Sequence, residues 1–508
     1  MFKNLTGVHK PDILDCISNL SSDEVFTPPE MVNRVLDLLP ANVWSNPNLR
    51  WLDPATKSGV FLREAAGRLM SGLSQVIPDE ETRREHIFKK MLFGLSITEL
   101  TGYIARRSLY YSKNAASDFS VVRFDKEHGN ILYFKGLHHY VNRKCFHCGS
   151  PEGVLDRGDH LENYAYSFIH DNTKTLGKKY ALSAFGDSMK FDVIIGNPPY
   201  QLQDAGDSTG ASPIYQLFVE QAKKLNPRYL SMIIPSRWFA GGKGLDEFRT
   251  NMLNDKRISH LVDYLDAGDC FPGVEVKGGI CYFLWDSQHK GLCEITTVMS
   301  GNRLPSAKRD LGEYDVFVRF NEAVSILRKV KAKGDPVFSS KVSTQKPFGF
   351  RTNFTNFRPD AFPGSVEIFA NKEVGYVDDA LITQNRAWLN KYKVLISMAY
   401  GAGEGFPHQI IGRPIVAGIP SCCTETYLVC GTFNTKKEAL NMEAYLKTKF
   451  VRFLISLRKN TQHVTRDRFL FVPDIGSQSK WDDATLYKRF KLTSTEIAFI
   501  ESIIKEMP

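Results

Sequence analysis

The first half of the chain alternates apolar runs with segments whose apolar residues fall at helical spacing. The runs at 49–53 and 191–195 are typical of buried strands. Helical spacing follows Thr27 and begins again near Val60, and residues 89–112 repeat the order of strand, turn and helix. This alternation predicts an α/β domain built on a parallel sheet.

Polar side chains stand at the ends of three predicted strands, at Asp53, Asn130 and Asn197. Open α/β sheets bind ligands at the carboxyl ends of their strands, so we expect these three side chains to converge. Asn130 is then placed to bind the edge of a purine ring. The short ATKSG loop after Asp53 lets a ligand approach backbone amides and the positive end of the next helix. A plain strand–helix turn explains that loop as well.

The stretch GNPPY at 196–200 follows a buried strand with an unusual set of residues. Pro198 and Pro199 fix φ near −65° and remove two amide donors, so the turn is stiff and rich in acceptors. Asn197 adds an amide side chain and Tyr200 an aromatic ring. The alternative is a rigid turn with Tyr200 as a core aromatic.

Glu99 follows the second predicted strand and has two interpretations. Its carboxylate is suited to accept hydrogen bonds from ribose hydroxyls. Ser96 and Glu99 also have the S-x-x-E spacing of a capping box at a helix start. Both interpretations remain open at this point.

Composition narrows the class of protein. The 508 residues require two or three domains, and the hydrophobic content of 43% is ordinary for a globular protein. A net charge of +9 weakly favours an anionic partner. Nine cysteines do not form a disulfide framework, and neither a secretory signal nor a long apolar run occurs, so we expect a cytoplasmic protein.

Several stretches together resemble the adenine-specific DNA methyltransferases of restriction-modification systems that use S-adenosylmethionine. FTPPEMV and DPATKSGVFL resemble the cofactor motifs, and NPPY matches the catalytic motif that follows them. MIIPSRWF (232–239) and DCFPGVEVKGGICYFLW (269–285) resemble later strands of the same fold. The resemblance covers about residues 20–290 and implies a Rossmann-like methyltransferase domain.

The resemblance implies a role for each matching residue. The catalytic set is Asn197, Pro198, Pro199, Tyr200 and Phe271. The cofactor-binding set is Phe26, Thr27, Asp53, Pro54, Ala55, Ser58, Gly59, Glu99, Asn130 and Asn197. Two positions depart from the family pattern, because Lys57 replaces a usual Gly and Ser96 stands where an acidic residue is usual.

The chemistry implied for NPPY suits an amino group. The Asn197 side-chain oxygen and the Pro198 carbonyl would accept the two N–H bonds of an adenine 6-amino group and make its lone pair available. The target base must leave the duplex, which costs a few kcal/mol. Stacking on Tyr200, worth about 1–3 kcal/mol, offsets much of that cost, with Phe271 as a second aromatic wall.

An insertion at about 138–188 interrupts the pattern and contains CFHCG. Cys145 and Cys148 have the form of one zinc knuckle, and His147, His160 and His170 are further candidate ligands. No second CxxC follows, so two free thiols in a loop are the alternative to a structural zinc.

The methyltransferase pattern ends near 295, and we expect residues 296–508 to form an α+β target-recognition domain. Residues 443–470 hold seven Lys or Arg against two acids, a net charge of +5, beside an apolar stripe at helical spacing. Arg458 and Lys459 are the candidate DNA contacts. A solvated helix face is the alternative.

The sequence also leaves room for functions other than methylation of double-stranded DNA. Asp263, Glu275 and Lys277 imitate the carboxylate and lysine set of metal-dependent nucleases. The same NPPY chemistry also serves RNA or a protein glutamine amide, and Lys57 and Ser96 are the best support for a DNA-binding restriction subunit without catalysis. A separate restriction nuclease or helicase subunit is an expected partner.

Overall fold

The computed structural model describes residues 26–152, 165–170, 181–186, 189–201, 212–242, 244–401, 407–459 and 462–507. The chain divides into two compact units, Met1–Phe317 and Val318–Pro508. The boundary lies beyond the predicted position at 295, because strands that follow 295 still pair with the sheet of the first unit. Within the described residues, no helix is long and apolar enough to cross a membrane.

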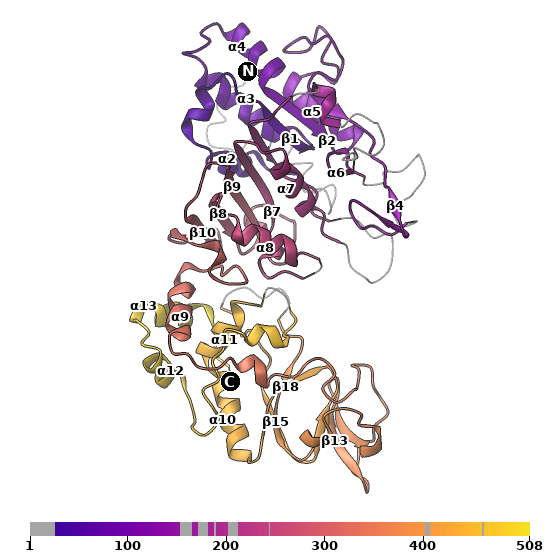
Figure 1. Cartoon of the computed structure of the whole chain (residues 1–508), viewed down its shortest axis with the longest axis vertical. Coiled ribbons are helices and arrows are strands. Elements are labelled where there is room, and N and C mark those ends of the chain that lie inside the picture. Colours follow the sequence, from indigo (N-terminus) through magenta and orange to yellow (C-terminus); the bar gives the residue numbers. More distant parts are fainter. Residues whose placement is uncertain are drawn as a thin grey trace, which may run out of the picture. The chain divides into compact units, whose positions relative to one another are not determined.

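The first unit is built on one large, mostly parallel sheet (Figure 1). Its strands are β1 (Trp51–Thr56), β2 (Leu92–Ser96), β3 (Ile131–Tyr133), β6 (Val193–Gly196), β7 (Tyr229–Pro235), β8 (Ile258–Tyr264), β9 (Ile280–Asp286), β10 (Cys293–Met299), β11 (Asn302–Arg303) and β12 (Ala307–Arg309). The order across the sheet is β11-β10-β8-β9-β7-β6-β1-β2-β3, with β12 paired to β10. Strand β9 is antiparallel to both of its neighbours, and β1, β2, β3, β6 and β7 are parallel.

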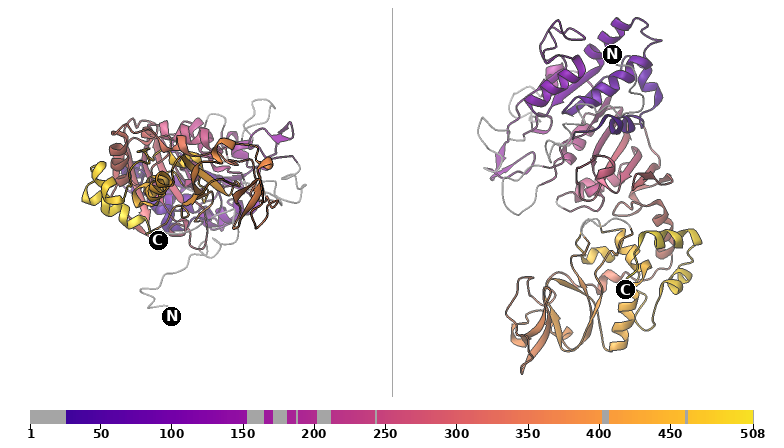
Figure 2. Two further views of the ribbon diagram at one scale, coloured as in Figure 1. Left: turned by 90° about the horizontal axis from the view of Figure 1, so that it is seen from below. Right: turned by 180° about the vertical axis from the view of Figure 1, so that it is seen from behind.

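Helices cover both faces of this sheet (Figures 1 and 2). They are α2 (Pro29–Leu36), α3 (Val60–Gly72), α4 (Glu80–His86), α5 (Glu99–Tyr110), α6 (Ser167–His170), α7 (Tyr215–Lys224) and α8 (Asp246–Asn254), with a π-helix at Ile87–Met91. Helices α2, α3 and α5 pack with Trp51, Val193 and Ile195 in one core, and α6, α7 and α8 pack with Leu52 and Ile194 in the other. The expectation of strands buried on both faces is confirmed.

The chain reverses its direction across the sheet between β1 and β6. It runs outward from β1 through β2 to β3, and then crosses back to β6 on the other side of β1. The loops at the carboxyl ends of β1 and β6 diverge at such a point, which opens a crevice for a ligand. The DPATKSG loop and NPPY occupy those two strand ends.

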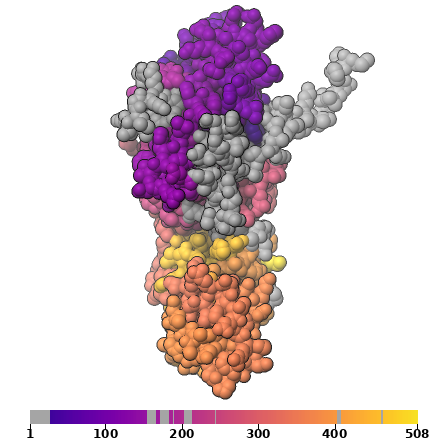
Figure 3. All heavy atoms as spheres, turned by 90° about the vertical axis from the view of Figure 1, so that its right-hand side faces the viewer, coloured from indigo at the N-terminus to yellow at the C-terminus, as the bar shows by residue number. Residues whose placement is uncertain are grey.

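The insertion between β3 and β6 carries a small hairpin and helix α6. Strands β4 (Tyr140–Val141) and β5 (Lys144–Cys145) form the hairpin, which lies at the surface of the first unit (Figures 1 and 3). Helix α6 is buried, and its Phe168 and Ile169 belong to the core beneath the sheet.

The second unit combines two small sheets with helices. The sheets are β14-β13-β17 and β16-β15-β18. Their strands are β13 (Ser365–Phe369), β14 (Val374–Asp378), β15 (Tyr392–Ser397), β16 (Ile415–Ala417), β17 (Ser421–Cys423) and β18 (Tyr427–Phe433). The helices are α9 (Asn321–Lys331), α10 (Lys436–Lys447), α11 (Lys449–Ser456), α12 (Asp483–Arg489) and α13 (Ser494–Ile503).

The basic segment at 443–470 is not one helix. Thr448 has extended backbone angles and ends α10 while its side chain caps the start of α11, with Val451 N–H donating to its hydroxyl at 3.2 Å. The apolar stripe predicted along this segment is buried in the unit, at Leu446, Phe450, Phe453, Leu454 and Leu457.

Candidate active site at the carboxyl ends of β1 and β6

Asp53 and the NPPY turn lie side by side at the point where the sheet reverses. A Cβ atom on Gly196 would lie 2.8 Å from Asp53 Oδ1, which is closer than real Cβ contacts allow. A glycine before Asn197 therefore lets the two strand ends approach each other. Asp53 is the third residue of β1 rather than its last, because the strand continues to Thr56.

The side chain of Asn197 is fixed by the first motif. Its Nδ2 donates to Thr27 Oγ1 at 3.0 Å, and both side chains are buried. This bond joins segments 170 positions apart and sets the direction in which the Asn197 Oδ1 acceptor points. Pro198 and Pro199 are also buried, so the turn that presents the amide is held rigidly.

Tyr200 and Phe271 are both buried and belong to the same large apolar cluster of the first unit. Phe271 follows a short helical turn at Ala267–Asp269, and its N–H donates to Ala267 O at 2.8 Å. Burial raises the pKa of the Tyr200 hydroxyl well above its ordinary value, and nearby Cys270 adds to the rise. The hydroxyl is therefore neutral, and the ring is an apolar surface with one polar edge.

The loop after Asp53 places a carboxylate and a lysine in buried positions. Burial raises the pKa of Asp53 to about 7, and the Ala55 amide, which donates to Oδ1 at 3.1 Å, and the charge of Lys57 limit the rise. Lys57 therefore acts on Asp53 from the position where the family pattern has glycine. Pro54, Ala55 and Ser58 are buried around them.

Gly59 and Phe26 belong to the two stretches that the sequence predicts to bind the cofactor. Gly59 has φ of 77° just before α3, and a Cβ there would lie 2.7 Å from Leu109 Cδ1 and 3.0 Å from Ala105 Cα. The glycine thus provides both the left-handed turn and the close packing of α5 against the loop. Phe26 is buried next to Thr27 in the sequence.

Glu99 is exposed in the first turn of α5, and the expected capping box of Ser96 with Glu99 is wrong. Thr98 caps the helix instead, in a reciprocal pair with Thr101, because β2 extends through Ser96. Tyr103 donates from its hydroxyl to Glu99 Oε1 at 3.2 Å. Ser96 is buried against Gly102 of α5. A Cβ atom on Gly102 would lie 3.2 Å from the Ser96 hydroxyl.

The structure does not bring Asn130 to the site. Asn130 precedes β3, so it lies at the amino end of a strand parallel to β2 rather than at the carboxyl end. Its Nδ2 donates to the carbonyls of Phe88 and Lys89 at 3.0 Å and of Leu92 at 3.2 Å. The expected contact with a purine ring is wrong, since this amide holds the corner that leads from the π-helix into β2.

The two residues expected to contact DNA have structural partners. Arg458 is buried, its Nε donates to Asp467 O at 2.9 Å, and its guanidinium lies over the Phe471 ring at 4.7 Å. Lys459 donates from Nζ to Tyr400 O at 2.9 Å. The expected phosphate contact is wrong for Arg458, because its long basic side chain is buried and donates to an internal carbonyl instead.

The nuclease-like set does not assemble. Asp263 is buried in β8 and accepts a hydrogen bond from Ser236 Oγ at 3.0 Å, while Glu275 and Lys277 are exposed in the loop before β9. Among the described residues, the grouping of side chains able to hold a metal is a different one, formed by His138, Cys145, Cys148 and His170.

That grouping includes both cysteines predicted from the sequence. His170 was a candidate ligand and is part of it, His147 lies beside it, and His160 is outside the described residues. His138 was missed, because it precedes the knuckle by seven residues and no standard spacing marks it.

Comparisons with known proteins agree on one family. The family model described as Eco57I restriction-modification methylase matches residues 90–271. A Mycoplasma pneumoniae protein described as an uncharacterized adenine-specific methylase is 41% identical over 327 residues, which covers 59% of this chain and 77% of that protein.

The solved structure of the type IIL restriction-modification enzyme MmeI in complex with DNA resembles this chain in fold. It has a TM-score of 0.51 and 12% sequence identity, and the match covers 88% of this chain and 67% of that one. From the identity and coverage of the mycoplasma relative, together with the family match, this chain belongs to the adenine-specific DNA methyltransferases of restriction-modification systems.

Proposed function

We propose that this enzyme transfers the methyl group of S-adenosylmethionine to the 6-amino group of a flipped adenine in a specific double-stranded DNA site. One observation carries the proposal. The Asn197 amide, held by Thr27, stands beside the Asp53 loop at the point where the sheet reverses. A methyl acceptor bound at Asn197 and a cofactor bound at the Asp53 loop are then neighbours.

Asn197 and Pro198 provide two acceptors for the amino group. The amide oxygen and the Pro198 carbonyl take its two N–H bonds, which draws the nitrogen lone pair out of conjugation with the ring. Since methyl transfer needs in-line placement and little acid–base chemistry, a rigid pair of acceptors suffices. The proline ring at 199 keeps that pair rigid by fixing φ.

Tyr200 and Phe271 provide the surface for the extruded base. Both rings are buried in the described structure, so a base gains access to them only if neighbouring side chains move. Stacking of about 1–3 kcal/mol per base offsets much of the few kcal/mol needed to unpair and unstack the adenine.

The residues of the Asp53 loop fit S-adenosylmethionine. The buried Asp53 carboxylate, which the Ala55 amide, Lys57 and the Thr56 side chain stabilise, is an acceptor suited to a ligand that carries cationic and hydroxyl groups. Gly59 allows the left-handed turn that leads into α3, whose positive end favours an anionic group of a ligand. Phe26, Thr27 and Asn197 line the other side, and Glu99 is the proposed ribose contact; S-adenosylmethionine supplies the methyl group when bound.

The direct test is incubation of the purified chain with tritiated S-adenosylmethionine and genomic DNA, followed by nucleoside analysis. We expect label in N6-methyladenine. Label in RNA or in a protein glutamine, with none in DNA, would move the activity to another planar amino group. Label in methylcytosine would contradict the proposed acceptor.

We further propose that the second unit selects the DNA site. The likeness in fold to MmeI, whose structure contains DNA, extends over 88% of this chain and supports this proposal. A fragment that ends at Phe317 keeps the whole sheet. We expect it to bind S-adenosylmethionine but to methylate duplex DNA very poorly, measured with the same tritium assay.

A fragment that methylates one specific sequence at the full rate would place recognition in the first unit instead. The second unit would then have another role, such as docking a separate nuclease or helicase subunit. A fragment that no longer binds the cofactor would show loss of folding, so cofactor binding is measured first.

A further inference from the structure

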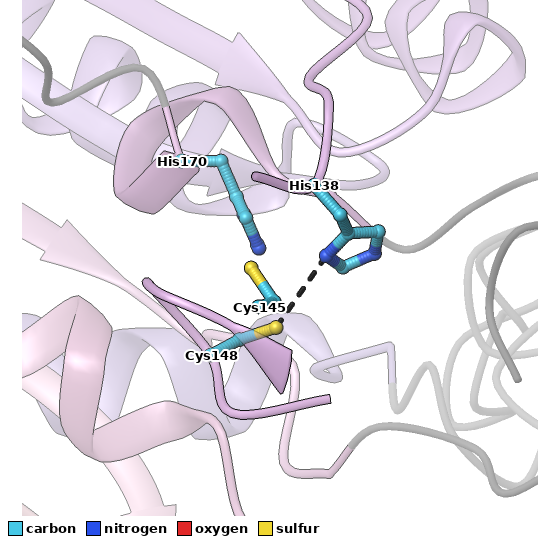
Figure 4. Close-up of side chains that lie close together, drawn as sticks. All are labelled: His138, Cys145, Cys148 and His170. Carbon is cyan, nitrogen blue, oxygen red and sulfur yellow. Dashed lines mark hydrogen bonds between the residues drawn. The ribbon is translucent and has the colours of Figure 1, made fainter. Parts of the chain in front are cut away.

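Four side chains of the insertion converge on one point (Figure 4). One ligand atom each from His138, Cys145, Cys148 and His170 lies within 4.8 Å of the other three. Cys145 and His170 are buried, and the other two are partly buried. Two sulfurs and two imidazole nitrogens form a donor set that is typical of zinc.

The backbone builds the cysteine half of this cluster as a chelating turn. Cys145 ends the β4–β5 hairpin, its N–H donates to Ser150 O at 2.8 Å, and Gly149 N–H donates back to Cys145 O at 2.8 Å. Gly149 has φ of 74°, which favours glycine at the position directly after the second cysteine. Both sulfurs therefore face the same side of the turn.

The histidine half comes from two segments that pair with each other. Lys135 and Tyr166 form an antiparallel bridge, and a Cβ on Gly136 would collide with the Ala165 carbonyl oxygen. His138 and His170 follow these two segments, and their rings lie 4.8 Å apart at their centroids. The pairing thus delivers both imidazoles to the turn.

The imidazole of His170 is oriented as a ligand. Its Nδ1 lies 3.0 Å from Tyr166 O, so this nitrogen carries the proton and Nε2 carries the lone pair. The side chain is fully buried, and Nε2 has no nitrogen or oxygen partner among the described residues. Figure 4 shows Nε2 pointing toward the Cys145 sulfur. His138 Nδ1 lies 3.5 Å from Cys148 Sγ.

We propose that these four residues hold one structural zinc ion. Zn–S bonds of about 2.3 Å and Zn–N bonds of about 2.0–2.1 Å need ligand atoms roughly 3.3–3.8 Å apart, so the cluster closes by small side-chain movements. Four protein ligands leave no open position for a water or substrate, which makes the site structural rather than catalytic.

The zinc ties the surface hairpin to the core of the methyltransferase unit. A two-stranded hairpin is marginal by itself, and β4 and β5 have two residues each. Helix α6, which carries His170, is anchored by Phe168 and Ile169 beneath the sheet. The metal therefore fixes the position of the exposed residues 141–144 relative to the sheet.

The test is the zinc content of the full chain, purified without chelators and measured by plasma mass spectrometry. We expect about one equivalent in the wild type, and at least a fivefold lower content in Cys148→Ser, His138→Ala and His170→Ala. His139→Ala and His147→Ala are matched controls, since each ring is next to the cluster but outside it, and both should keep the metal. His138→Cys should also keep it, because a thiolate can replace the imidazole.

Folding is monitored separately, since a lost ligand can unfold the insertion. Binding of S-adenosylmethionine by the Cys148→Ser chain reports whether the sheet is intact. Cobalt reconstitution of the wild type should give the visible absorption of a tetrahedral thiolate site. A wild type with no zinc, a Cys145–Cys148 disulfide found by mass spectrometry, or equal metal loss in His147→Ala and His138→Ala would each overturn the proposal.

Discussion

The sequence predicts functional residues in two regions, for different reasons. One is the edge of the sheet at β1 and β6, and the other is the basic segment at 443–470. At the edge, Asp53 and Asn197 are placed by strands whose direction is dictated by the α/β pattern. In the basic segment only charge and apolar spacing were available, and Arg452 and Arg458 are buried on internal carbonyl groups. Position in a topology therefore predicts where a polar side chain lies better than charge does.

The physical reason for the difference lies in what each signal constrains. The carboxyl ends of parallel strands lie at one edge of the sheet, so the position of a polar residue at such an end is narrowly determined. An arginine side chain is long and has five donors, and it can reach solvent, a phosphate or a buried carbonyl from the same backbone position. Burial of Arg452, which donates to the carbonyls of Gln409 and Lys505, is one such outcome.

The strongest test of the sheet edge is Asn197→Ala. We expect methyl transfer to fall about 100- to 1,000-fold, because the change removes an acceptor needed in the transition state. Affinity for DNA should stay within a few-fold, since no phosphate contact is lost. The tritium assay measures the first effect, and a gel shift at fixed salt measures the second. A variant with nearly normal rate would remove Asn197 from the mechanism.

The matching test of the basic segment is Arg458→Ala. We expect the second unit to lose about 1.5–3 kcal/mol of unfolding free energy, because the Asp467 carbonyl loses a charged donor. The salt dependence of DNA binding should not change, as the side chain does not face solvent. Lys480→Ala is the exposed control and should be neutral in urea denaturation. If Arg458→Ala is as stable as the wild type and its DNA binding depends less steeply on salt, Arg458 contacts a phosphate after all.

Several features of the fold were predictable from the sequence and others were not. The helix after Thr27, the helix from Val60 and the parallel strand before Asn197 follow from periodicity and turn residues. Asn130 was assigned to the wrong end of its strand, because a run as short as Ile131–Tyr133 does not reveal where pairing begins.

Local alternatives and long-range contacts were the other sources of error. Ser96 and Thr98 both have capping side chains, and only the length of β2 decides that Thr98 caps α5. The pairing of Lys135 with Tyr166 brings the segments of His138 and His170 together, and His138 Nδ1 lies 3.5 Å from Cys148 Sγ, which no local spacing encodes. The grouping of His138 and His170 with the two cysteines is assembled from three segments, so the sequence reveals its Cys-x-x-Cys part more readily than its histidines.

A smaller change tests how tightly the two strand ends fit. Gly196→Ala introduces a methyl group 2.8 Å from Asp53 Oδ1, and we expect a loss of about 1–3 kcal/mol in unfolding free energy. Gly67→Ala adds the same group to α3 where no atom lies within 4 Å, so it should be neutral or slightly stabilising. Equal stability of the two variants would show that a methyl group fits between Gly196 and Asp53 without strain.

A further test concerns the ionisation of Asp53. Its pKa is raised from 3.8 to about 7 by burial, so the folded protein holds a proton that the unfolded chain releases above about pH 4. Unfolding free energy contributed by this group is therefore highest below pH 4 and falls as the pH rises to about 7. Asp53→Asn should remove that decline, measured by urea denaturation from pH 4 to 8.

Binding of S-adenosylmethionine should show the opposite trend. A cationic ligand favours the carboxylate, so its affinity should rise roughly tenfold from pH 6 to pH 8 as Asp53 with a pKa of about 7 ionises. The amino group of the ligand also titrates, near pH 8. The control is therefore calorimetry with Asp53→Asn, in which the amino group of the ligand alone causes the pH dependence. Glu99→Ala should keep the full pH dependence, because its side chain is exposed at the start of α5. If Asp53→Asn keeps the dependence and Glu99→Ala abolishes it, the carboxylate that recognises the cofactor follows β2 rather than lying within β1.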